Sequence, residues 1–500
     1  MKKPKKIRKK RSKSWASKPI FWILLLAIFL RFYKLGELFH WTLDEEFWSY
    51  IPFNIATGYH IPLIGGPISG TGLYLGPLFV WLMAIPFFLT QGNPIGIAAF
   101  VSSLGVLTVA VMFWVGKTLF DRTTGLVAAL LSASSFLWVI YDRKYWNASP
   151  IPLLSLITIF CMYRIAKGKM KWSYVLAFVL ALAFHAHMSS GALLLFVFLG
   201  WIVLKLPVRK KEVLSAIALF LALQLPLVLF EFRHQFINTK ALMGLFAQKG
   251  ESTPIGTALG DIARLAVNTA GRLFYAPVNL DIANELTLCT QYAEARFQPP
   301  FWTAVLAIAV LVFMMRRRSK LGHKLILLLM GVNFLGLVWH RMRAGVGNWY
   351  PGQLSEYFFF PSFPAVFLGL ASFTTLLMRK TKRQAWLVKL GLALLIGLNV
   401  AAIITAKHSD GFAKKREIVR QVVQKVGNEP FLLTVENDDP CRLYGFRYLF
   451  SVYSKEPSQS YLDPQFGWLY ERRLPKRQPT KAVVISSQSG IVGFRIEEIR

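Results

Sequence analysis

Residues 19–50 read PIFWILLLAIFLRFYKLGELFHWTLDEEFWSY. The first half of this stretch is an apolar run, and the second half carries three consecutive acidic residues, Asp44, Glu45 and Glu46. The apolar run favours a membrane helix. No small-x-small cleavage site follows the run, so we expect a retained signal anchor and not a removed signal peptide. The stretch therefore predicts one membrane helix followed by an acidic loop at the membrane surface.

The composition of the whole chain is that of a membrane protein. Of its 500 residues, 54% are hydrophobic and only 17% are charged, and the mean hydropathy is +0.44. Ordinary soluble domains contain about 25% charged residues. The apolar runs are continuous and do not alternate, which excludes a β-barrel. The composition thus predicts an α-helical polytopic membrane protein, and it excludes a disordered chain, a coiled coil and a disulfide-stapled secreted domain.

The net charge of +33 invites a nucleic-acid-binding interpretation, but the distribution of the basic residues argues against it. Of the 58 lysines and arginines, 30 lie in six short segments: 2–18, 117–122, 164–171, 205–211, 316–324 and 379–389. The first segment precedes the apolar runs and the others lie between them. Such placement is typical of cytoplasmic loops that face anionic lipid. We therefore expect a basic cytoplasmic tail over residues 1–18.

The apolar runs predict about eleven transmembrane helices, at 19–35, 94–116, 125–141, 150–166, 173–187, 188–206, 213–230, 301–315, 323–340, 355–378 and 386–406. A further apolar stretch, 71–90, would make a twelfth. If it crossed the membrane, most basic loops would move to the side opposite the basic N-terminus. The positive-inside rule therefore places 71–90 on the outer membrane face as an interfacial helix.

Three large segments of the chain are then expected on the outer side of the membrane: two loops within the membrane domain of residues 19–406 and the tail that follows it. The first outer loop, 36–93, contains no Lys or Arg, and the second, 231–300, is rich in charged and aromatic residues. The tail, 407–500, has 16 Lys and Arg against 11 Asp and Glu. Its pattern predicts a helix over 416–426 and strands at 430–436, 481–487 and 494–499. We expect a small extracytoplasmic α/β domain there.

The acidic cluster of the first outer loop is flanked by Trp41, Phe47 and Trp48. Apolar rings remove water from a carboxylate, which makes it a better base. A base at this depth could deprotonate a hydroxyl while a lipid-borne donor stays in the bilayer. The alternative is an ordinary solvated loop that happens to be acidic.

The order of these segments resembles that of the GT-C glycosyltransferases. The likeness includes the protein O-mannosyltransferase-like, lipid A aminoarabinose transferase-like and RgtA/B/C/D-like families. It is strongest over residues 20–210, where Leu30-Arg31, Asp44-Glu45 and then Ala56-Thr57-Gly58 follow the family pattern. One departure is that the second span, GIAAFVSSLG, lacks an arginine that is common there in the family.

The resemblance implies roles for several residues. The first-loop aspartate of the family is the catalytic base, which corresponds to Asp44, with Glu45 beside it to orient the acceptor or assist. Basic residues on the outer side hold the donor phosphate in the family. The matching candidates here are Arg143 and Lys144, which end the segment Tyr141-Asp142-Arg143-Lys144, since a guanidinium can bind a phosphate through two hydrogen bonds.

Further candidates lie at the outer ends of later spans. Arg341 and Arg343, next to His340, are candidate phosphate contacts. The candidate acceptor or sugar contacts are His185, His187, Glu356 and Tyr357. For each of these residues the alternative is an ordinary polar anchor at the membrane interface. His185 and His187 are two residues apart on a helix and point in different directions, which makes them poor joint metal ligands.

The function that the resemblance implies is transfer of a hexosyl or pentosyl group from a polyprenyl-phosphate donor to an acceptor hydroxyl, with inversion, on the outer face of a bacterial plasma membrane. The acceptor would be a glycan, a lipid or a protein, and the sequence leaves open whether a divalent cation takes part. A flippase or transporter for lipid-linked glycans, an O-antigen-ligase-like enzyme and a non-catalytic scaffold are the alternatives. The missing internal repeat argues against a transporter. Pairing of Cys289 with Cys441 is left open.

Overall fold

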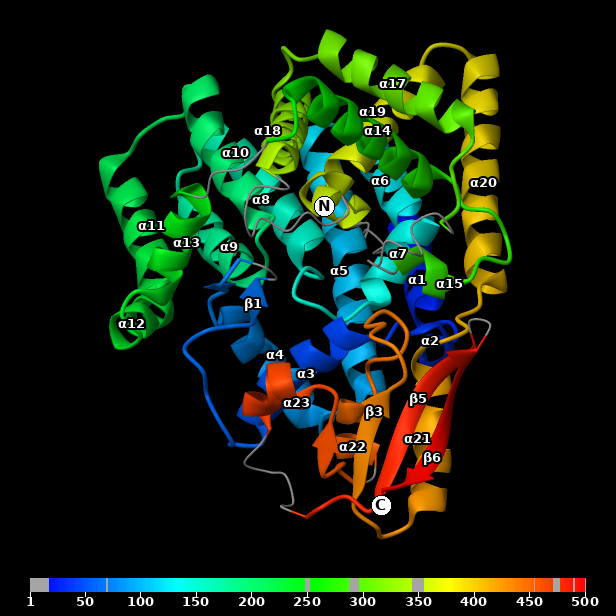
Figure 1. The fold of residues 1–500 in the computed structure, drawn as a ribbon. Coiled ribbons are helices and arrows are strands. Elements are labelled where there is room, and N and C mark those ends of the chain that lie inside the picture. Colours follow the sequence, from blue (N-terminus) through cyan, green and yellow to red (C-terminus); the bar gives the residue numbers. More distant parts are fainter. Residues whose placement is uncertain are drawn as a thin grey trace, which may run out of the picture.

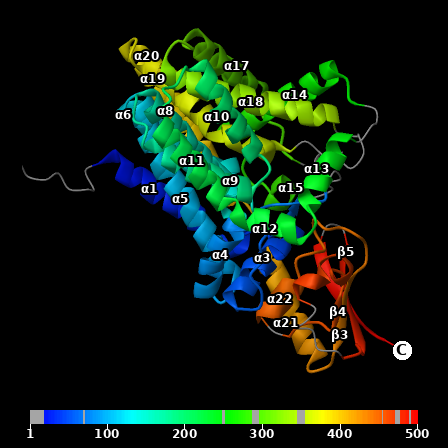
Figure 2. The ribbon, with the colours of Figure 1, turned by 90° about the vertical axis from the view of Figure 1, so that its left-hand side faces the viewer.

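A computed structural model describes residues 18–68, 71–247, 252–286, 296–343, 355–453, 455–470, 477–488 and 491–499 of the chain. A large bundle of helices forms most of the molecule, and a smaller domain with a β-sheet lies at one end of it (Figures 1 and 2). This smaller domain is the C-terminal part of the chain, and it lies beside α3 and α4 of the first outer loop (Figure 1).

The predicted spans coincide with helices. The bundle contains α1 (Pro19–Phe32), α5 (Pro94–Leu119), α6 (Arg122–Ser134), α7 (Phe136–Arg143), α8 (Ile151–Ala166), α9 (Trp172–Ala186), α10 (Ser190–Val203), α11 (Lys210–Leu223), α12 (Leu225–Arg233), α17 (Phe301–Arg316), α18 (Leu321–Arg343), the 3-10 helix η2 (Glu356–Ser362), α19 (Phe363–Met378) and α20 (Lys382–Thr405). Each predicted span matches one of these helices or a consecutive pair of them.

The number of spans is a separate question. Among the described residues, four helical segments are long and apolar enough to cross a membrane, or six if each bent pair counts as one span. The two bent pairs are α6–α7, at 65°, and α11–α12, at 47°. The other apolar helices have 10–17 residues, fewer than the roughly 20 that a straight crossing requires. The count of about eleven therefore stays a prediction.

The break between α6 and α7 is held by polar groups from distant parts of the chain. Arg31 of α1 donates to the carbonyls of Ala133 and Ser132, at 3.1 and 3.2 Å, which have lost their helical partners. Its Nε donates to Asp142 at 2.8 Å. A Cβ on Gly105 of α5 would come within 2.5 Å of the Asp142 carboxyl, so only glycine leaves room there. Because backbone groups freed in a membrane need partners, these contacts make the break stable.

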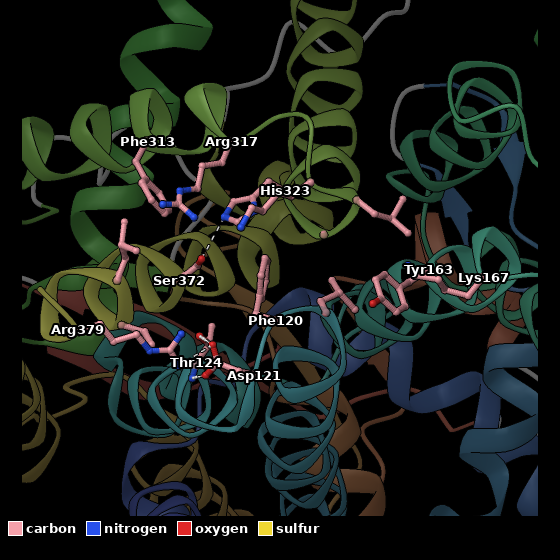
Figure 3. A pocket seen from close by; sticks show the side chains of 16 residues that line it. Phe120, Asp121, Thr124, Tyr163, Lys167, Phe313, Arg317, His323, Ser372 and Arg379 are labelled. Carbon is pink, nitrogen blue, oxygen red and sulfur yellow. Dashed lines mark hydrogen bonds and ion pairs between the residues drawn. The ribbon is translucent and has the colours of Figure 1, made fainter.

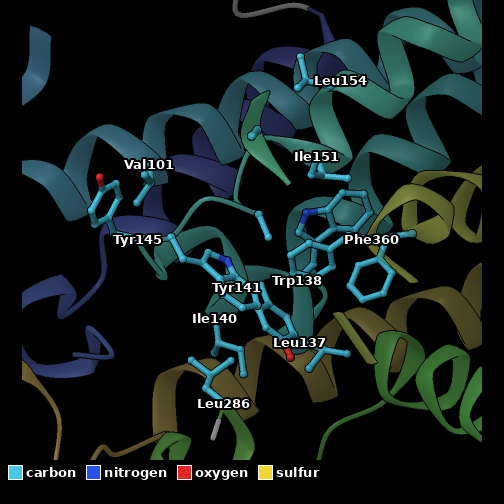
Figure 4. Close-up of a cluster of buried hydrophobic side chains, with 14 of the residues drawn as sticks. Val101, Leu137, Trp138, Ile140, Tyr141, Tyr145, Ile151, Leu154, Leu286 and Phe360 are labelled. Carbon is cyan, nitrogen blue, oxygen red and sulfur yellow. The ribbon is translucent and has the colours of Figure 1, made fainter. Parts of the chain in front are cut away.

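The protein core surrounds α7. Leu137, Trp138, Ile140 and Tyr141 of this helix are each 4% exposed or less and pack with side chains from α5, α8 and η2 (Figure 4). The helix that follows the break is therefore buried on every side, which fixes the position of the residues that come directly after it, Lys144 to Asn147.

The first outer loop is ordered throughout its described residues. It contains α2 (Leu35–Leu38), α3 (Leu43–Ala56), a hairpin of β1 (Pro67–Ile68) with β2 (Leu73–Tyr74), and α4 (Leu78–Leu89). The helix expected within 71–90 is α4. Its side chains Leu82, Ile85, Phe88 and Leu89 are 45–73% exposed. Such an apolar face suits the predicted position at the membrane surface, which stays a prediction.

The second outer loop folds into α13 (Ile237–Ala247), α14 (Ile255–Phe274) and α15 (Ile282–Leu286). The tail contains α21 (Phe412–Val426), β3 (Phe431–Val435), α22 (Arg447–Tyr453), β4 (Gln459–Ser460), α23 (Asp463–Phe466), the 3-10 helix η3 (Gly467–Leu469), β5 (Lys481–Gln488) and β6 (Ile491–Glu498). The expected helix and the three expected strands of the tail are α21, β3, β5 and β6.

The tail strands form one four-stranded sheet in the order β4-β3-β5-β6. The strand β3 runs parallel to β4 and β5, while β5 and β6 are antiparallel, with Val483 opposite Ile496. The helix α21 buries Ile418, Val419 and Val422 against this sheet region. The structure therefore confirms a small α/β domain at the C-terminus.

Candidate active site

The three acidic residues of the first outer loop lie in the first turn of α3. This helix begins after Thr42, whose backbone N–H and hydroxyl both donate to Glu45 Oε2, at 2.8 and 3.0 Å. Such a contact from the third helical residue back to the residue before the helix stabilises its start. Because successive residues of a helix are rotated by about 100°, the carboxylates of Asp44, Glu45 and Glu46 point in three directions. Each one has a different environment.

Glu45 is fully buried and forms an ion pair with Lys144. The ammonium of Lys144 is also buried, with 1% of its side chain exposed, and it lies over the ring of Trp146 at 4.8 Å. Removing one member of a buried ion pair leaves an uncompensated charge. The pair therefore fixes the start of α3 against the segment that follows α7.

Asp44 is the carboxylate that remains accessible. Its side chain is 38% exposed, and its Oδ2 lies 3.7 Å from Nζ of Lys144. It lines a cavity of about 470 Å³, which we call the outer cavity. The described residues that line it are Asp44, Trp48, Pro67, Ile68, Thr71, Leu75, Trp146, Asn147, His187, Met188, Ser189, Gly191, Ala192, Leu195, Val332, Asn333, Gly336, Leu337, Trp339, His340, Tyr357 and Phe358.

The walls of the outer cavity are mainly apolar and aromatic, and Asp44 is the only acidic residue among the described residues that line it. One wall consists of α10 and α18. On these helices Leu195 and Trp339 are each 44% exposed, so the cavity borders a surface that would face lipid if both helices cross the membrane. The cavity thus joins a carboxylate, aromatic rings and an apolar outer surface.

Trp146 is a cavity residue that the sequence analysis missed. It is 3% exposed, and its indole N–H has no hydrogen-bond partner among the described residues. Its ring packs against Tyr357 at 4.8 Å and Tyr141 at 6.2 Å. A buried donor without a partner is costly, which makes it a candidate contact for a bound ligand. Its place two residues after Lys144, in an aromatic-rich outer loop, was the available signal.

Glu46 holds the C-terminal domain. Its carboxylate accepts hydrogen bonds from the backbone N–H groups of Gly445 and Tyr448, at 3.0 and 2.8 Å, and from the hydroxyl of Tyr461 at 3.3 Å. Burial raises the pKa of Glu46 to about 7, although the N–H donors of Tyr448 and Gly445 oppose this rise. Glu46 therefore attaches α3, the helix that carries Asp44, to the C-terminal domain.

Arg143 does not line the outer cavity. It is 1% exposed, and its guanidinium donates to the carbonyl of Leu30 and, at 3.1 Å, to that of Tyr33. These carbonyls belong to the C-terminal end of α1, where helical carbonyls lack partners. In the structure Arg143 thus supports the end of α1, and Lys144 is the cation beside Asp44. The predicted phosphate contact of Arg143 stays a prediction.

The two histidines at the end of α9, His185 in its last turn and His187 directly after it, have different surroundings. His185 is buried, its Nδ1 accepts from the backbone N–H of Leu78 at 3.2 Å, and its Nε2 lies 2.7 Å from Oε1 of Gln224. It therefore anchors the start of α4 and does not line the outer cavity. His187 does line it, and its Nδ1 lies 2.8 Å from the Ser189 hydroxyl. Only His187 is placed for the predicted contact with a sugar or acceptor.

Glu356 and Tyr357 are also separated by the fold. Glu356 is 3% exposed and pairs with Arg272 at 2.7 Å, and it accepts from the hydroxyl of Tyr141 at 3.1 Å. Arg272 also pairs with Glu285 at 2.8 Å. Glu356 thus belongs to a buried ion network that joins η2, α14 and α15, whereas Tyr357 lines the outer cavity.

The cations at the outer end of α18 point away from the outer cavity lining. Arg341 donates to Asp261 at 2.9 Å and to the Thr253 hydroxyl at 3.1 Å, and Arg343 donates to the Leu245 carbonyl at 3.0 Å. Their neighbour His340 lines the cavity. Of the residues that the structure describes, no three His, Cys, Asp or Glu side chains are grouped so that they could hold a metal ion. Cys289 lies outside the described residues, so its pairing with Cys441 stays open.

Comparisons with known proteins bear on this geometry. The family of dolichyl-phosphate-mannose-protein mannosyltransferases matches residues 75–230. No curated protein sequence matches the chain. Among solved structures, ArnT from Cupriavidus metallidurans in the apo state has a TM-score of 0.61 and 11% identity, covering 95% of this chain and 94% of that one.

Two further structures are similar over nearly the whole chain. ArnT from Cupriavidus metallidurans bound to undecaprenyl phosphate has a TM-score of 0.58 and 10% identity, covering 94% of this chain and 93% of that one. The apo form of the oligosaccharyltransferase from Archaeoglobus fulgidus has a TM-score of 0.56 and 12% identity, covering 94% of this chain and 70% of that one. At these identities the shared property is the fold alone, and the coverage shows that the likeness extends over both the helical bundle and the C-terminal domain of this chain.

Proposed function

We propose that this chain, which has the fold of the GT-C glycosyltransferase superfamily, transfers a sugar from a polyprenyl-phosphate donor to an acceptor hydroxyl at the outer face of the membrane. The observation that carries the proposal is that Asp44 is the only acidic residue among the described residues that line the outer cavity. A carboxylate that is fully exposed to water would be an ordinary surface group. Asp44 instead lines a cavity whose walls are aromatic and border the apolar helices of the bundle.

The lining of the outer cavity suits both halves of such a donor. Aromatic faces, here Trp48, Trp146 and Tyr357, stack on sugar rings, and the apolar surface between α10 and α18 suits a polyprenyl chain. The neighbouring folds support the same class of donor, since one was solved with undecaprenyl phosphate and another with a dolichol-phosphate.

The proposed reaction needs a base and a way to stabilise a leaving phosphate. Asp44 takes the proton from the acceptor hydroxyl, whose oxygen then bonds to the anomeric carbon with inversion. The bond between that carbon and the phosphate oxygen breaks, and the phosphate leaves with its lipid. The indole N–H of Trp146 supplies a donor at this wall of the cavity, and the buried ammonium of Lys144, 3.7 Å from Asp44 but outside the cavity lining, adds a positive charge close to it. Preorganised groups of this kind stabilise developing negative charge.

The residues predicted from the sequence have different roles under this proposal. Asp44 acts as the base, while Glu45 positions Lys144. His187 and Tyr357 contact the sugar or the acceptor. Arg143, Arg341 and Arg343 remain candidates for the phosphate only if the site extends beyond the lining described here, whereas His185 and Glu356 have structural partners.

The test is transfer by the full chain in lipid vesicles, using a panel of undecaprenyl-phosphate-linked sugars, with binding of undecaprenyl phosphate measured separately. Asp44→Asn keeps the size of the side chain and removes its basicity. Because general base catalysis contributes typically 10²–10⁴-fold, we expect transfer to fall by about that factor while lipid binding is retained.

The matched control is Glu37→Gln, which neutralises an acid in the same loop. Glu37 is 65% exposed and pairs only with Lys34 at 3.3 Å among the described residues. Normal transfer by Asp44→Asn would refute the proposed base. Loss of transfer in both variants would show that transfer depends on the total negative charge of the first outer loop and not on the Asp44 carboxylate alone.

A further inference from the structure

A second cavity lies at the opposite ends of the membrane helices. It measures about 420 Å³, and we call it the inner cavity. It is formed by the α5–α6 turn, the end of α8, the α17–α18 turn and the end of α19, which are among the segments that charge places in the cytoplasm (Figure 3). Its lining residues are Leu119, Phe120, Asp121, Thr124, Tyr163, Lys167, Phe313, Arg317, Lys320, Leu321, Gly322, His323, Ser372, Thr375, Leu376 and Arg379.

The inner cavity has an excess of positive charge. Its one carboxylate among these residues, Asp121, is already used: it accepts from the backbone N–H of Thr124 at 3.0 Å and pairs with Arg379 at 3.0 Å. Within the described part of the chain, no carboxylate pairs with Lys167, Arg317 or Lys320. Three cations from two different turns, Lys167 after α8 and Arg317 and Lys320 between α17 and α18, therefore line one space without a counter-charge.

Two buried polar atoms at this cavity also lack partners. Nδ1 of His323, a residue that is 3% exposed, and the hydroxyl of Thr375, which is 2% exposed, form no hydrogen bond with the described residues. The other ring nitrogen of His323 lies 3.1 Å from the Ser372 hydroxyl, which fixes the ring in the cavity wall beside Arg317 (Figure 3). Buried polar groups normally have partners, so such a pair indicates a missing ligand.

The remaining walls of the inner cavity are apolar. Phe120 and Phe313 pack against the His323 ring, at 4.8 and 5.5 Å, and Arg317 lies over Phe313 at 5.4 Å. Leu119 and Leu376 complete the apolar part. A ligand that fits this cavity has an anionic group for the cations and an apolar portion for the rings and leucines.

We propose that the inner cavity binds a phosphate group at the cytoplasmic face, supplied by the headgroup of an anionic phospholipid. Arg317, Lys320 and Lys167 neutralise the phosphate, while Nδ1 of His323 and the Thr375 hydroxyl donate to its oxygens. Basic cavities between membrane helices on the cytoplasmic side are suited to such headgroups. The bound lipid would hold together the inner ends of α5, α8, α17, α18 and α19. A free phosphate shares this chemistry, and the experiment separates the two sources.

The experiment uses the full chain in nanodiscs that contain either phosphatidylcholine alone or phosphatidylcholine with phosphatidylglycerol. Bound lipid is counted by native mass spectrometry and the thermal midpoint is measured in both. We compare Arg317→Gln/Lys320→Gln with Arg316→Gln/Arg318→Gln, which makes the same charge change in the same turn at residues outside the cavity lining. Because a hydrogen bond to a charged group contributes about tenfold or more in affinity, the cavity variant should bind phosphatidylglycerol at least about tenfold more weakly than the control variant, which loses only a general surface attraction.

Equal losses in the two variants would overturn the proposal, because they would show only a general surface attraction. In a second arm, inorganic phosphate or glycerol phosphate is added to nanodiscs of phosphatidylcholine alone. Stabilisation in this arm without any effect of phosphatidylglycerol would replace the lipid with a soluble phosphate.

Thr375→Val distinguishes a hydroxyl that binds a ligand from one that is simply left unpaired in the protein core. In an empty cavity this change removes a buried hydroxyl without a partner, so it leaves the protein as stable or more stable. If the hydroxyl donates to a phosphate, the variant loses part of the stabilisation by phosphatidylglycerol, and its binding weakens about threefold to tenfold. Unchanged binding together with increased stability would count against the site.

Discussion

The outer and inner cavities are similar in volume, about 470 and 420 Å³, but opposite in their charges. The outer cavity has one carboxylate among aromatic walls, and the inner one has four cations with a single carboxylate. The carboxylates of the two cavities, Asp44 and Asp121, also differ in how far neighbouring groups already bind them. Asp121 is committed to a helix start and to Arg379, whereas Asp44 keeps 38% of its side chain exposed because Glu45 occupies the nearby ammonium of Lys144. A charged side chain is available for chemistry only where its neighbours have other partners.

The largest expected effect concerns the ion pair that frees Asp44. Glu45→Gln leaves the buried Lys144 ammonium with only the Asp44 carboxylate, at 3.7 Å, and breaking a buried pair typically costs about 3–5 kcal/mol. The matched change in the inner cavity is Arg379→Gln, because Arg379 is 58% exposed and its pair with Asp121 is worth about 1 kcal/mol or less. Thermal or denaturant unfolding in detergent measures both. Equal losses of stability would contradict the claim that the two cavities use their ion pairs differently.

A double variant sharpens this prediction. Glu45→Leu/Lys144→Met removes both charges and should recover much of the lost stability, since apolar replacement of a buried pair is often neutral or better. Transfer should stay low, because the variant still lacks the ammonium beside Asp44. Recovery of both stability and transfer would show that Lys144 has no role in the reaction.

An intermediate effect is expected at Trp146. Trp146→Phe keeps an aromatic ring at the outer cavity and removes the indole N–H, which has no partner among the described residues. A hydrogen bond to a charged group contributes about 1.5–3 kcal/mol, so the affinity for undecaprenyl phosphate should fall by about tenfold or more. Trp138, which is 1% exposed in the core around α7 and does not line the outer cavity, provides the control. Trp138→Phe should not change this affinity.

The smallest effect is a pH dependence of the outer end. The pKa of Glu46 is raised by burial from 4.5 to about 7, so the folded protein binds this proton more tightly than the unfolded chain. Its contribution to stability is therefore complete below pH 4.5 and is lost as the pH rises through about 7. The thermal midpoint should fall between pH 5 and 8, and Glu46→Gln should flatten this slope. An unchanged slope in the variant would assign the pH dependence to other groups.

Most of the fold could be predicted from local sequence. Each expected span matches a helix or a helix pair, and the expected tail strands at 430–436, 481–487 and 494–499 match β3, β5 and β6. Apolar runs and alternating strands leave a periodic signal that is independent of tertiary contacts. The 65° break between α6 and α7 left no such signal, because it depends on partners such as Arg31 and Asn399 that lie far away in the sequence.

The candidate site was predictable only in part. The outer cavity brings together Asp44, His187 and Tyr357 from the expected set, while Arg143, His185 and Glu356 have other partners. Sequence reasoning could place each residue at the outer membrane face but not decide its direction. Neighbouring residues of one helix, such as Glu356 and Tyr357, point to different surroundings. Trp146 and the inner cavity were missed because aromatic residues and basic turns are ordinary features of membrane proteins.

The sequence by itself determined the class of the protein, the distribution of charge along the chain and the acidic residues that follow the first apolar run, since hydropathy and charge act locally and sum along the chain. Only the tertiary structure decided which charges stay free. Glu45 lies 99 residues from Lys144, and Glu46 lies 402 residues from Tyr448. Pairing over such separations depends on how the helices pack, because a short-range interaction forms only between groups that the fold brings into contact. The availability of Asp44 is a consequence of these pairings.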